Sequence, residues 1–325
     1  MEKRILGIGN ALVDILIQTE NDTILDQLQL PKGSMQLVDS KSSEKVNEKT
    51  AHLNRTRACG GSAANTIHGL AKLGVSTGFI GHVGEDETGE FFKKDLLAAG
   101  VEPKLFSSTT LSGIAHALVS QDGERTFATH LGAAIELSEK HLTPNLFEGY
   151  DYLYVEGYLV ANKPLIIKAI NLAKEAGLKI VLDLASYNVV EENREFLLNL
   201  VKEKVDIVFC NEEEAKALTG KTPQETLDFL AQYTEIAIVK IGKEGSLIKK
   251  GGETIRVAAF DVKASDTTGA GDMYAAGFLY GLINGKDLHE SGRIGTLLAA
   301  NVIEVIGAKM DESRWKKIRA QITMP

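Results

Sequence analysis

A stretch near the C-terminal end decides the fold: Ala264-Ser265-Asp266-Thr267-Thr268-Gly269-Ala270-Gly271-Asp272 runs without a break into an apolar segment over residues 273–283. This segment is hydrophobic almost all round, which predicts a buried helix whose N-terminus lies inside the protein. Gly269, Ala270 and Gly271 carry little or no side chain, so backbone N–H groups at the helix start can approach a ligand closely. Because these amides are unpaired and lie at the positive end of the helix dipole, they predict an anion site.

Asp272 places a carboxylate beside this predicted anion site. An aspartate in the first helical turn ordinarily stabilises the helix dipole and does nothing more, and a bare Gly-x-Gly-Asp string does not go beyond that interpretation. A carboxylate next to a place built for negative charge favours instead a group that handles protons. Amides that bind a phosphoryl group, with a base for the attacking hydroxyl, are the parts of a phosphoryl-transfer centre.

A second glycine-rich stretch, Cys59-Gly60-Gly61-Ser62-Ala63-Ala64-Asn65-Thr66-Ile67, continues as a predicted helix through Leu73 and ends at Gly74. Its paired glycines again allow close approach of the backbone at a helix entrance, and Asn65 lies about one turn inside. The alternative is a plain N-cap at Ser62 with flexible residues before it.

Together the two stretches resemble the two signatures of the ribokinase-like (PfkB) family of sugar and nucleoside kinases. The resemblance implies that Gly60, Gly61 and Asn65 hold substrate hydroxyls and that Asp272 is the base, assisted by the amides of Gly269, Ala270 and Gly271. It also implies an α/β fold with a mainly parallel, doubly wound sheet and a small β-sheet lid, and ATP and Mg²⁺ as cofactors. The resemblance covers essentially the whole chain, so residues 1–325 are predicted to form a single kinase domain.

Composition points to a small-molecule partner. The chain has 325 residues with a formal net charge of −8, which argues against a nucleic-acid or anionic-membrane surface. It contains two cysteines, and no apolar run approaches the ~20 residues needed to span a bilayer. The first residues lack a long apolar core with a cleavage site. We therefore expect a cytoplasmic protein with reduced cysteines.

Strands that alternate with helices predict the main sheet. Apolar segments at 78–84, 152–155, 179–183 and 206–210 each lead to a helical pattern, and the segment 236–241 follows one. Such alternation gives a mainly parallel sheet that is covered on both faces. Ligands then gather at the carboxyl ends of the strands.

Further β segments interrupt this alternation. Residues 35–38 and 114–131 read as strands, the second with an Asp122-Gly123 hairpin turn. With no helices expected between them, they predict a lid formed by excursions at about 11–39 and 106–131. Such a lid can shield its own active site in a monomer or pair with a neighbour's lid in a homodimer.

The first strand, residues 4–9, ends in Gly7-Ile8-Gly9, which resembles the start of a dinucleotide-binding loop. The third glycine and the later acidic residue of that motif are missing, so we reject this interpretation. Asn10 and Asp14 follow at the carboxyl end of the strand, where open sheets bind ligands, and are candidate substrate-binding residues.

Two loops after strands are candidates for ATP binding. Asn211 and Glu214 open an acidic helical turn, which on its own is typical of a solvated helix start. The resemblance implies instead that they lie near the phosphates, with Glu214 acting on Mg²⁺ through water. The loop from Lys240 to Gly245, with Gly242 inside it, resembles the family's nucleotide loop, although many relatives have threonine in place of Lys240.

The resemblance also assigns residues near the C-terminal end. It places Thr268 at ATP and Asn301 beside the adenine, although Asn301 also fits a polar residue on an exposed helix face. Asp266 and Thr268, with the Gly307-Ala308 turn, would lie near a monovalent-cation loop that holds K⁺.

Three features favour a nucleoside substrate. The segments 9–14 and 123–134 resemble the first-strand and lid motifs of adenosine kinases, in which Arg125 corresponds to a lid arginine that reaches the phosphates. Tyr158 follows a strand where those enzymes stack a ring on the purine, although a core tyrosine would look the same. Residues 34–36 do not reproduce their adenine-contacting lid residues. A ribose or fructose kinase, and a non-catalytic sugar- or nucleotide-sensing protein, therefore remain alternatives.

Overall fold

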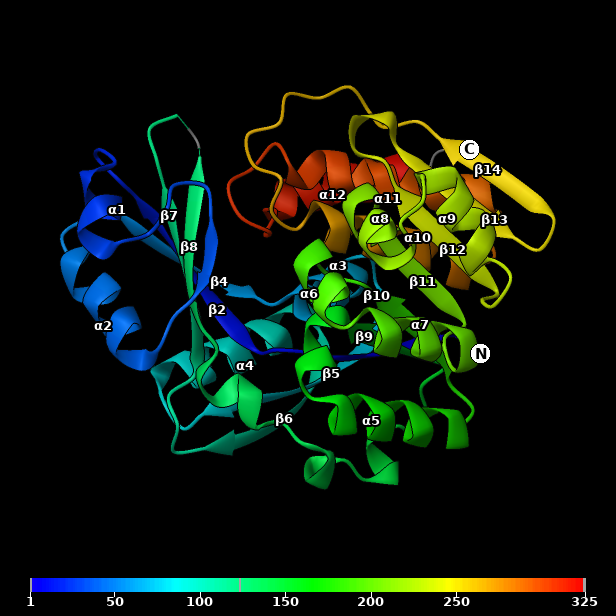
Figure 1. Ribbon diagram of the computed structural model, residues 1–325, viewed down its shortest axis with the longest axis horizontal. Coiled ribbons are helices and arrows are strands. Elements are labelled where there is room, and N and C mark those ends of the chain that lie inside the picture. The colour runs from blue at the N-terminus through cyan, green and yellow to red at the C-terminus, as the bar shows by residue number, and fades with distance from the viewer. Residues whose placement is uncertain (1, 123, 324–325) are drawn as a thin grey trace.

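The main body is built on one large, mainly parallel sheet, shown in Figure 1. The computed structural model describes residues 2–122 and 124–323, so Gly123 of the expected hairpin turn lies outside the described residues. Within those ranges the sheet has nine strands in the order β14-β13-β12-β11-β10-β9-β1-β5-β6. The strands are β1 (Arg4–Ile8), β5 (Ser76–Gly84), β6 (Val101–Ser108), β9 (Tyr152–Glu156), β10 (Lys179–Asp183), β11 (Ile207–Asn211), β12 (Ile236–Lys240), β13 (Ser246–Lys250) and β14 (Glu253–Val257).

The parallel strands confirm the predicted fold class. Neighbouring strands from β6 to β12 pair in parallel, while β13 and β14 add an antiparallel edge that the sequence pattern did not indicate. The central strands β9 and β11 are apolar up to their last residue, as expected of strands with both faces buried. Their carboxyl ends meet at one edge of the sheet, where the candidate site lies.

Helices cover the two faces of this sheet. One apolar cluster includes side chains from α3 (Ser62–Lys72), α4 (Glu87–Ala99), α10 (Ala270–Ile283), α11 (Leu288–Val302) and α12 (Glu312–Thr323). The other includes side chains from α5 (Lys163–Glu175), α6 (Tyr187–Glu192), α7 (Arg194–Glu203), α8 (Glu212–Thr219) and α9 (Pro223–Leu230). No helix among the described residues combines the length and apolar character needed to cross a bilayer.

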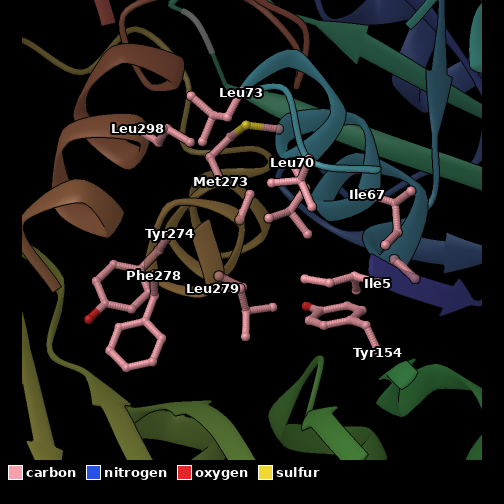
Figure 2. Packing of buried hydrophobic residues seen from close by; sticks show 14 of the residues in the cluster. Ile5, Ile67, Leu70, Leu73, Tyr154, Met273, Tyr274, Phe278, Leu279 and Leu298 are labelled. Atoms are coloured by element: carbon pink, nitrogen blue, oxygen red, sulfur yellow. The ribbon is translucent and has the colours of Figure 1, made fainter. Parts of the chain in front are cut away.

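Helix α10 is the buried helix that the sequence predicts. Met273, Tyr274, Phe278 and Leu279 are nearly or fully buried, and Figure 2 shows them among side chains from α3, α11 and the sheet. Burial of side chains of this size contributes roughly 1.5–3 kcal/mol each. A Cβ atom on Gly277 would lie 2.5 Å from the Ile294 carbonyl oxygen, so this glycine permits the close contact with α11. The packing fixes where the N-terminus of α10 lies.

A separate sheet forms the lid beside the body (Figure 1). In the part of the chain that the structure describes, it has five strands in the order β3-β8-β7-β2-β4. They are β2 (Leu12–Gln18), β3 (Met35–Leu37), β4 (Arg55–Gly60), β7 (Gly113–Val119) and β8 (Arg125–His130). Strands β7 and β8 pair antiparallel, which confirms the predicted hairpin.

The lid differs from the helix-free excursions expected over 11–39 and 106–131. Helices α1 (Thr23–Leu28) and α2 (Ser40–Lys49) lie within the first excursion and after it, and that lid segment continues through β4 to Gly60. Residues 106–108 belong instead to β6 of the body. The helices are present because Leu25, Leu28 and Val46 cover one apolar face of the lid sheet.

Candidate active site

Asp272 lies where the two glycine-rich stretches meet. It is in the first turn of α10, which follows Gly269 in a left-handed conformation with φ 75°. The Ser62 hydroxyl donates a hydrogen bond to Asp272 Oδ1 over 2.7 Å, and Asn65 Nδ2 donates to Oδ2 over 3.0 Å. Burial raises the pKa of Asp272 to about 6, and these hydrogen bonds limit the rise. The carboxylate is therefore ionised at neutral pH yet basic enough to accept a proton.

Ser62 is not the N-cap of α3. Gly61, with φ 90°, occupies that position, and the Ser62 hydroxyl is used on Asp272 instead. The plain N-cap interpretation of this stretch is wrong for a physical reason: the Ser62 hydroxyl contacts a carboxylate from another helix and does not cap its own.

The candidate acceptor-binding residues come together beside Asp272. A Cβ atom on Gly60 would lie 2.1 Å from Asp14 Oδ1, and one on Gly61 would lie 2.2 Å from the Asn10 carbonyl oxygen. The glycine pair thus lets β2 and the end of β1 approach α3. Among the described residues, Asn65 Oδ1 is buried without a hydrogen-bond partner. It is an acceptor suited to a hydroxyl donor from a ligand.

Asp14 is an acidic member of this group on the lid strand β2. Burial raises its pKa to about 7, against the lowering effect of Lys309, and the Asp272 carboxylate adds to the rise. Asp14 and Asp272 are close enough for each carboxylate to disfavour the charge of the other. Such a pair favours hydrogen-bond donors, for example two neighbouring hydroxyls of a ligand.

Glu156 supports the site and was not expected from the sequence. It ends β9 and is buried, and its carboxylate accepts hydrogen bonds from Asn10 N, Asn10 Nδ2 and Ala63 N over 2.9, 2.7 and 2.9 Å. Burial raises the pKa of Glu156 to about 7, and these hydrogen bonds oppose the rise. Glu156 therefore joins the end of β1 to the start of α3, and the side-chain amide of Asn10 is directed at this carboxylate.

Asn211 and Glu214 form a reciprocal cap at the start of α8. Asn211 Oδ1 accepts from Glu214 N over 2.8 Å, and the Glu214 carboxylate accepts from Asn211 N and Nδ2. Glu214 is only 2% exposed, so the solvated-turn interpretation is wrong for this residue. Burial raises its pKa to about 7 even though the Lys240 ammonium lowers it.

Lys240 ends β12 and lies between β10 and α10. Its Nζ is 3.2 Å from Asp183 Oδ2, at the carboxyl end of β10. A Cβ atom on Gly271 would lie 3.1 Å from the same Nζ. Asp183 was missed from the sequence, although an aspartate that ends an apolar strand is a signal that could have found it.

The loop after Lys240 depends on its glycines. Gly242 and Gly245 have φ 55° and 99°, and a Cβ atom on Gly245 would lie 1.9 Å from the Val257 carbonyl oxygen.

Asn301 lies on α11, where its Nδ2 donates to the Leu297 carbonyl of the same helix over 2.9 Å. Its contact with adenine stays a prediction.

Arg125 connects the lid to the body. Its guanidinium pairs with Asp266 Oδ2 over 2.5 Å and donates to Thr268 Oγ1 over 3.0 Å. Asp266 also accepts from Thr268 N at 3.0 Å and Gly307 N at 2.6 Å. Both of its oxygens are thus engaged and its charge is paired with that of Arg125. A monovalent cation in this loop stays a prediction.

Tyr158 lies in a short 3₁₀ helix, Gly157–Ala161, directly after β9. Burial raises its pKa to about 12, and the Asp272 and Glu156 carboxylates act in the same direction. The half-buried ring of Tyr158 therefore lies near the Asp272 and Glu156 carboxylates.

The chain is similar to known kinases. The family model for pfkB family carbohydrate kinases matches residues 34–314. The 5-dehydro-2-deoxygluconokinase of Halalkalibacterium halodurans is 31% identical over 262 residues, which cover 75% of this chain and 79% of that protein. The adenosine kinase from Sinorhizobium meliloti has a TM-score of 0.88 with 34% identity, over 99% of this chain and 100% of that one. A probable sugar kinase from Rhizobium etli has a TM-score of 0.89 with 32% identity, over 98% of both chains.

Proposed function

The chain belongs to the pfkB family of carbohydrate kinases, phosphotransferases with an alcohol acceptor, and we propose that it transfers the γ-phosphoryl group of ATP to a primary hydroxyl of a nucleoside. One observation carries the proposal: Ser62 and Asn65 hold the Asp272 carboxylate at the start of α10, where the N-cap residue, Gly269, makes no side-chain cap. The whole chain, 1–325, would act as a single kinase domain in the cytoplasm.

In the proposed reaction Asp272 takes the proton of the acceptor hydroxyl. The hydroxyl oxygen then bonds to the γ-phosphorus, the bond from that phosphorus to the bridging oxygen breaks, and ADP leaves with the electron pair. The amides of Gly269–Asp272 would stabilise charge on the transferred group. Because the pKa of Asp272 is about 6, the base is ready at neutral pH without a prior deprotonation step.

The charge of the acceptor pocket favours a neutral substrate. The carboxylates of Asp14 and Asp272 and the side-chain oxygen of Asn65 can accept hydrogen bonds from a ligand, which suits neighbouring hydroxyls of a ribose. An anionic sugar acid would add negative charge next to Asp14 and Asp272, although the Lys309 and Arg125 cations also act on Asp14. The pocket chemistry therefore supports a nucleoside or neutral sugar, and the likeness to an adenosine kinase over the full chain supports a nucleoside.

ATP would lie over the loops 211–214, 240–245 and 268–272, with Asn301 beside its adenine. Glu214 and Asp183 offer buried carboxylate oxygens, the ligand type that Mg²⁺ prefers, and the raised pKa of Glu214 means that its charge is incompletely balanced. These residues fit Mg²⁺ held through water, and the ion would neutralise charge on the phosphates. Tyr158 would stack on the nucleoside base.

A panel of acceptors tests the proposal. We would measure kcat/KM for adenosine, ribose, fructose and 5-dehydro-2-deoxygluconate with ATP and Mg²⁺, for the wild type and Tyr158→Ala. Adenosine should be the best substrate, and Tyr158→Ala should lower its kcat/KM by ~5–100-fold while sparing free sugars, as expected from a lost stacking contact. Tyr233→Ala, an exposed tyrosine on the body, is the matched control.

The other outcomes separate the alternatives. A free sugar or the sugar acid outperforming adenosine, with no effect of Tyr158→Ala, would make this a sugar kinase of the same fold. Binding of an acceptor without any turnover would favour the non-catalytic sensing protein. The retained Asp272 and its glycine-rich helix start argue against that last alternative.

A further inference from the structure

Lys240 occupies an electrostatically unusual position. Its Nζ lies 3.1 Å from where a Cβ atom on Gly271 would stand, at the N-terminus of α10. The unpaired amides of a helix N-terminus carry partial positive charge, so an ammonium group beside them is repelled. Its side chain is only 15% exposed, and water therefore screens the repulsion weakly.

Carboxylates from two elements, Asp183 of β10 and Glu214 of α8, act on the Lys240 ammonium. Burial lowers the pKa of this lysine, but the Asp183 and Glu214 carboxylates outweigh burial, so its pKa lies above the usual value. Lys240 in turn favours the ionised form of Asp272. The other titratable groups that face Lys240 are Cys210 and Tyr274, both of whose pKa values are raised by burial. The Lys240 ammonium thus lies between these carboxylates and the N-terminus of α10.

Gly271 leaves the space between Lys240 and the helix start open. Any side chain at this position would have its Cβ 3.1 Å from Nζ and would stand between the ammonium and a ligand at the amides. Two donors of positive charge, the amides and Lys240, therefore face the same small space. An anion placed there would relieve their mutual repulsion, and a phosphoryl group is an anion of the required size and charge.

We propose that Lys240, together with the amides of Gly269–Asp272, binds the phosphoryl group that is transferred, and is a catalytic residue of this chain. The inference rests on the proposed kinase function and adds a side-chain cation to its backbone anion site. It also gives a role to the position where the sequence departs from the threonine of many relatives. A purely structural role, in which Lys240 only neutralises Asp183, is the competing explanation.

The two roles differ in their effect on nucleotide binding. If Lys240 faces the γ-phosphoryl group, Lys240→Met should weaken binding of a non-hydrolysable ATP analogue by about tenfold or more and leave ADP binding nearly unchanged. It should also lower kcat by roughly 10²–10³, the usual effect of removing one charge-stabilising donor. Lys240→Arg keeps the positive charge and should recover part of both losses.

Removal of the lysine leaves Asp183 buried without its ion-pair partner, which can destabilise the fold. The double variant Lys240→Met/Asp183→Asn removes both charges. Asp183→Asn alone is measured beside it, because Asp183 is also a proposed Mg²⁺ residue and only the difference between these two variants reports on Lys240. The double variant should fold. It should lack the preference for the ATP analogue over ADP that we expect of the wild type. Lys179→Met is the control, because Lys179 pairs with Glu235 over 2.6 Å at the opposite end of the same sheet.

A folded double variant that keeps both the wild-type kcat and the wild-type preference for the ATP analogue over ADP would overturn the inference. The proposed function fails separately, if the wild type phosphorylates no acceptor. In that case the nucleotide-binding comparison still decides whether Lys240 faces the γ-phosphoryl group.

Discussion

Asn65 Nδ2 lies 3.0 Å from Asp272 Oδ2, so two helix starts that are far apart in the sequence hold one carboxylate between them. Ser62 donates to the other carboxylate oxygen from the same first turn of α3. Helices α3 and α10 pack directly against each other, and a Cβ atom on Gly69 would lie 2.9 Å from that of Ala276. The close packing of the two helices thus fixes the orientation of the proposed base.

Asp272→Asn should lower kcat by ~10²–10⁴ while ATP still binds, because the amide cannot accept the proton of the acceptor. Steady-state kinetics with ATP and the best acceptor, together with nucleotide binding by calorimetry, measure both effects. Asp261→Asn, an exposed aspartate in the preceding loop, should behave as the wild type. If Asp272→Asn kept more than about half of the wild-type turnover, Asp272 would not be the base.

Ser62→Ala should move the acidic limb of the pH–rate profile to higher pH. The hydrogen bond from Ser62 favours the ionised form of Asp272, whose pKa is about 6. Without that bond the carboxylate holds its proton more strongly, so a higher pH is needed to generate the base. The profile of kcat/KM between pH 5 and 9 reports this pKa in the free enzyme. An unshifted limb, or a shift to lower pH, would show that the limb belongs to another group.

Much of the body could be predicted from the sequence. Apolar segments such as 179–183 and 206–210 are buried on both faces, and a strand of that kind is recognisable by composition alone. The glycine-rich stretches were informative for a similar reason, since Gly61 and Gly269 adopt positive φ angles that other residues avoid.

The parts that could not be predicted depend on contacts between distant residues. Glu156 accepts hydrogen bonds from residues 146 and 93 positions earlier, and no local pattern encodes such a partnership. Helix α2 is rich in lysine, serine and glutamate and buries only Ser43 and Val46, so its sequence lacks an apolar stripe. Its role in covering the lid follows only from the assembled sheet.

Asp14→Asn should stabilise the unliganded protein at pH 8 while impairing acceptor binding. The folded-state pKa of Asp14 is about 7, above the ordinary value near 3.9, so the folded state holds this proton more tightly than the unfolded state does. The native state is therefore favoured at low pH, and that advantage is lost as the pH rises from about 4 through 7. Because the side chain keeps some exposure to solvent, we expect a gain of about 1–3 kcal/mol at pH 8.

Urea unfolding of wild type and Asp14→Asn at pH 4.5 and pH 8 measures this difference. The gain at pH 8 should shrink strongly at pH 4.5, where the wild-type carboxyl is protonated in the folded state. An equal difference at the two pH values would contradict a buried, ionising Asp14.

Glu214→Gln should raise the Mg²⁺ concentration needed for half-maximal activity by about tenfold or more. Glutamine keeps the reciprocal cap at the start of α8, apart from one of the two hydrogen bonds from Asn211, so stability should fall by only about 1 kcal/mol. The exposed neighbour Glu213→Gln is the matched control, because it has the same charge change on the same turn. Identical Mg²⁺ titrations for the three proteins would leave Glu214 with only its capping role.

Arg125→Gln should loosen the lid without unfolding the body. Its pair with Asp266 joins lid to body with side chains only 9% and 3% exposed, whereas the lid–body pair of Arg57 with Glu87 is exposed at 49% and 84%. Loss of the buried pair should cost about 1–3 kcal/mol. The cost is below that of leaving a buried carboxylate with no partner, because Gly307 N and Thr268 N still donate to Asp266. Loss of the exposed pair should cost well under about 1 kcal/mol. Hydrogen exchange in residues 12–60 and 113–130 should therefore accelerate roughly tenfold or more in Arg125→Gln and stay unchanged in Arg57→Gln. Equal exchange in both variants and the wild type would show that Arg125 does not hold the lid closed.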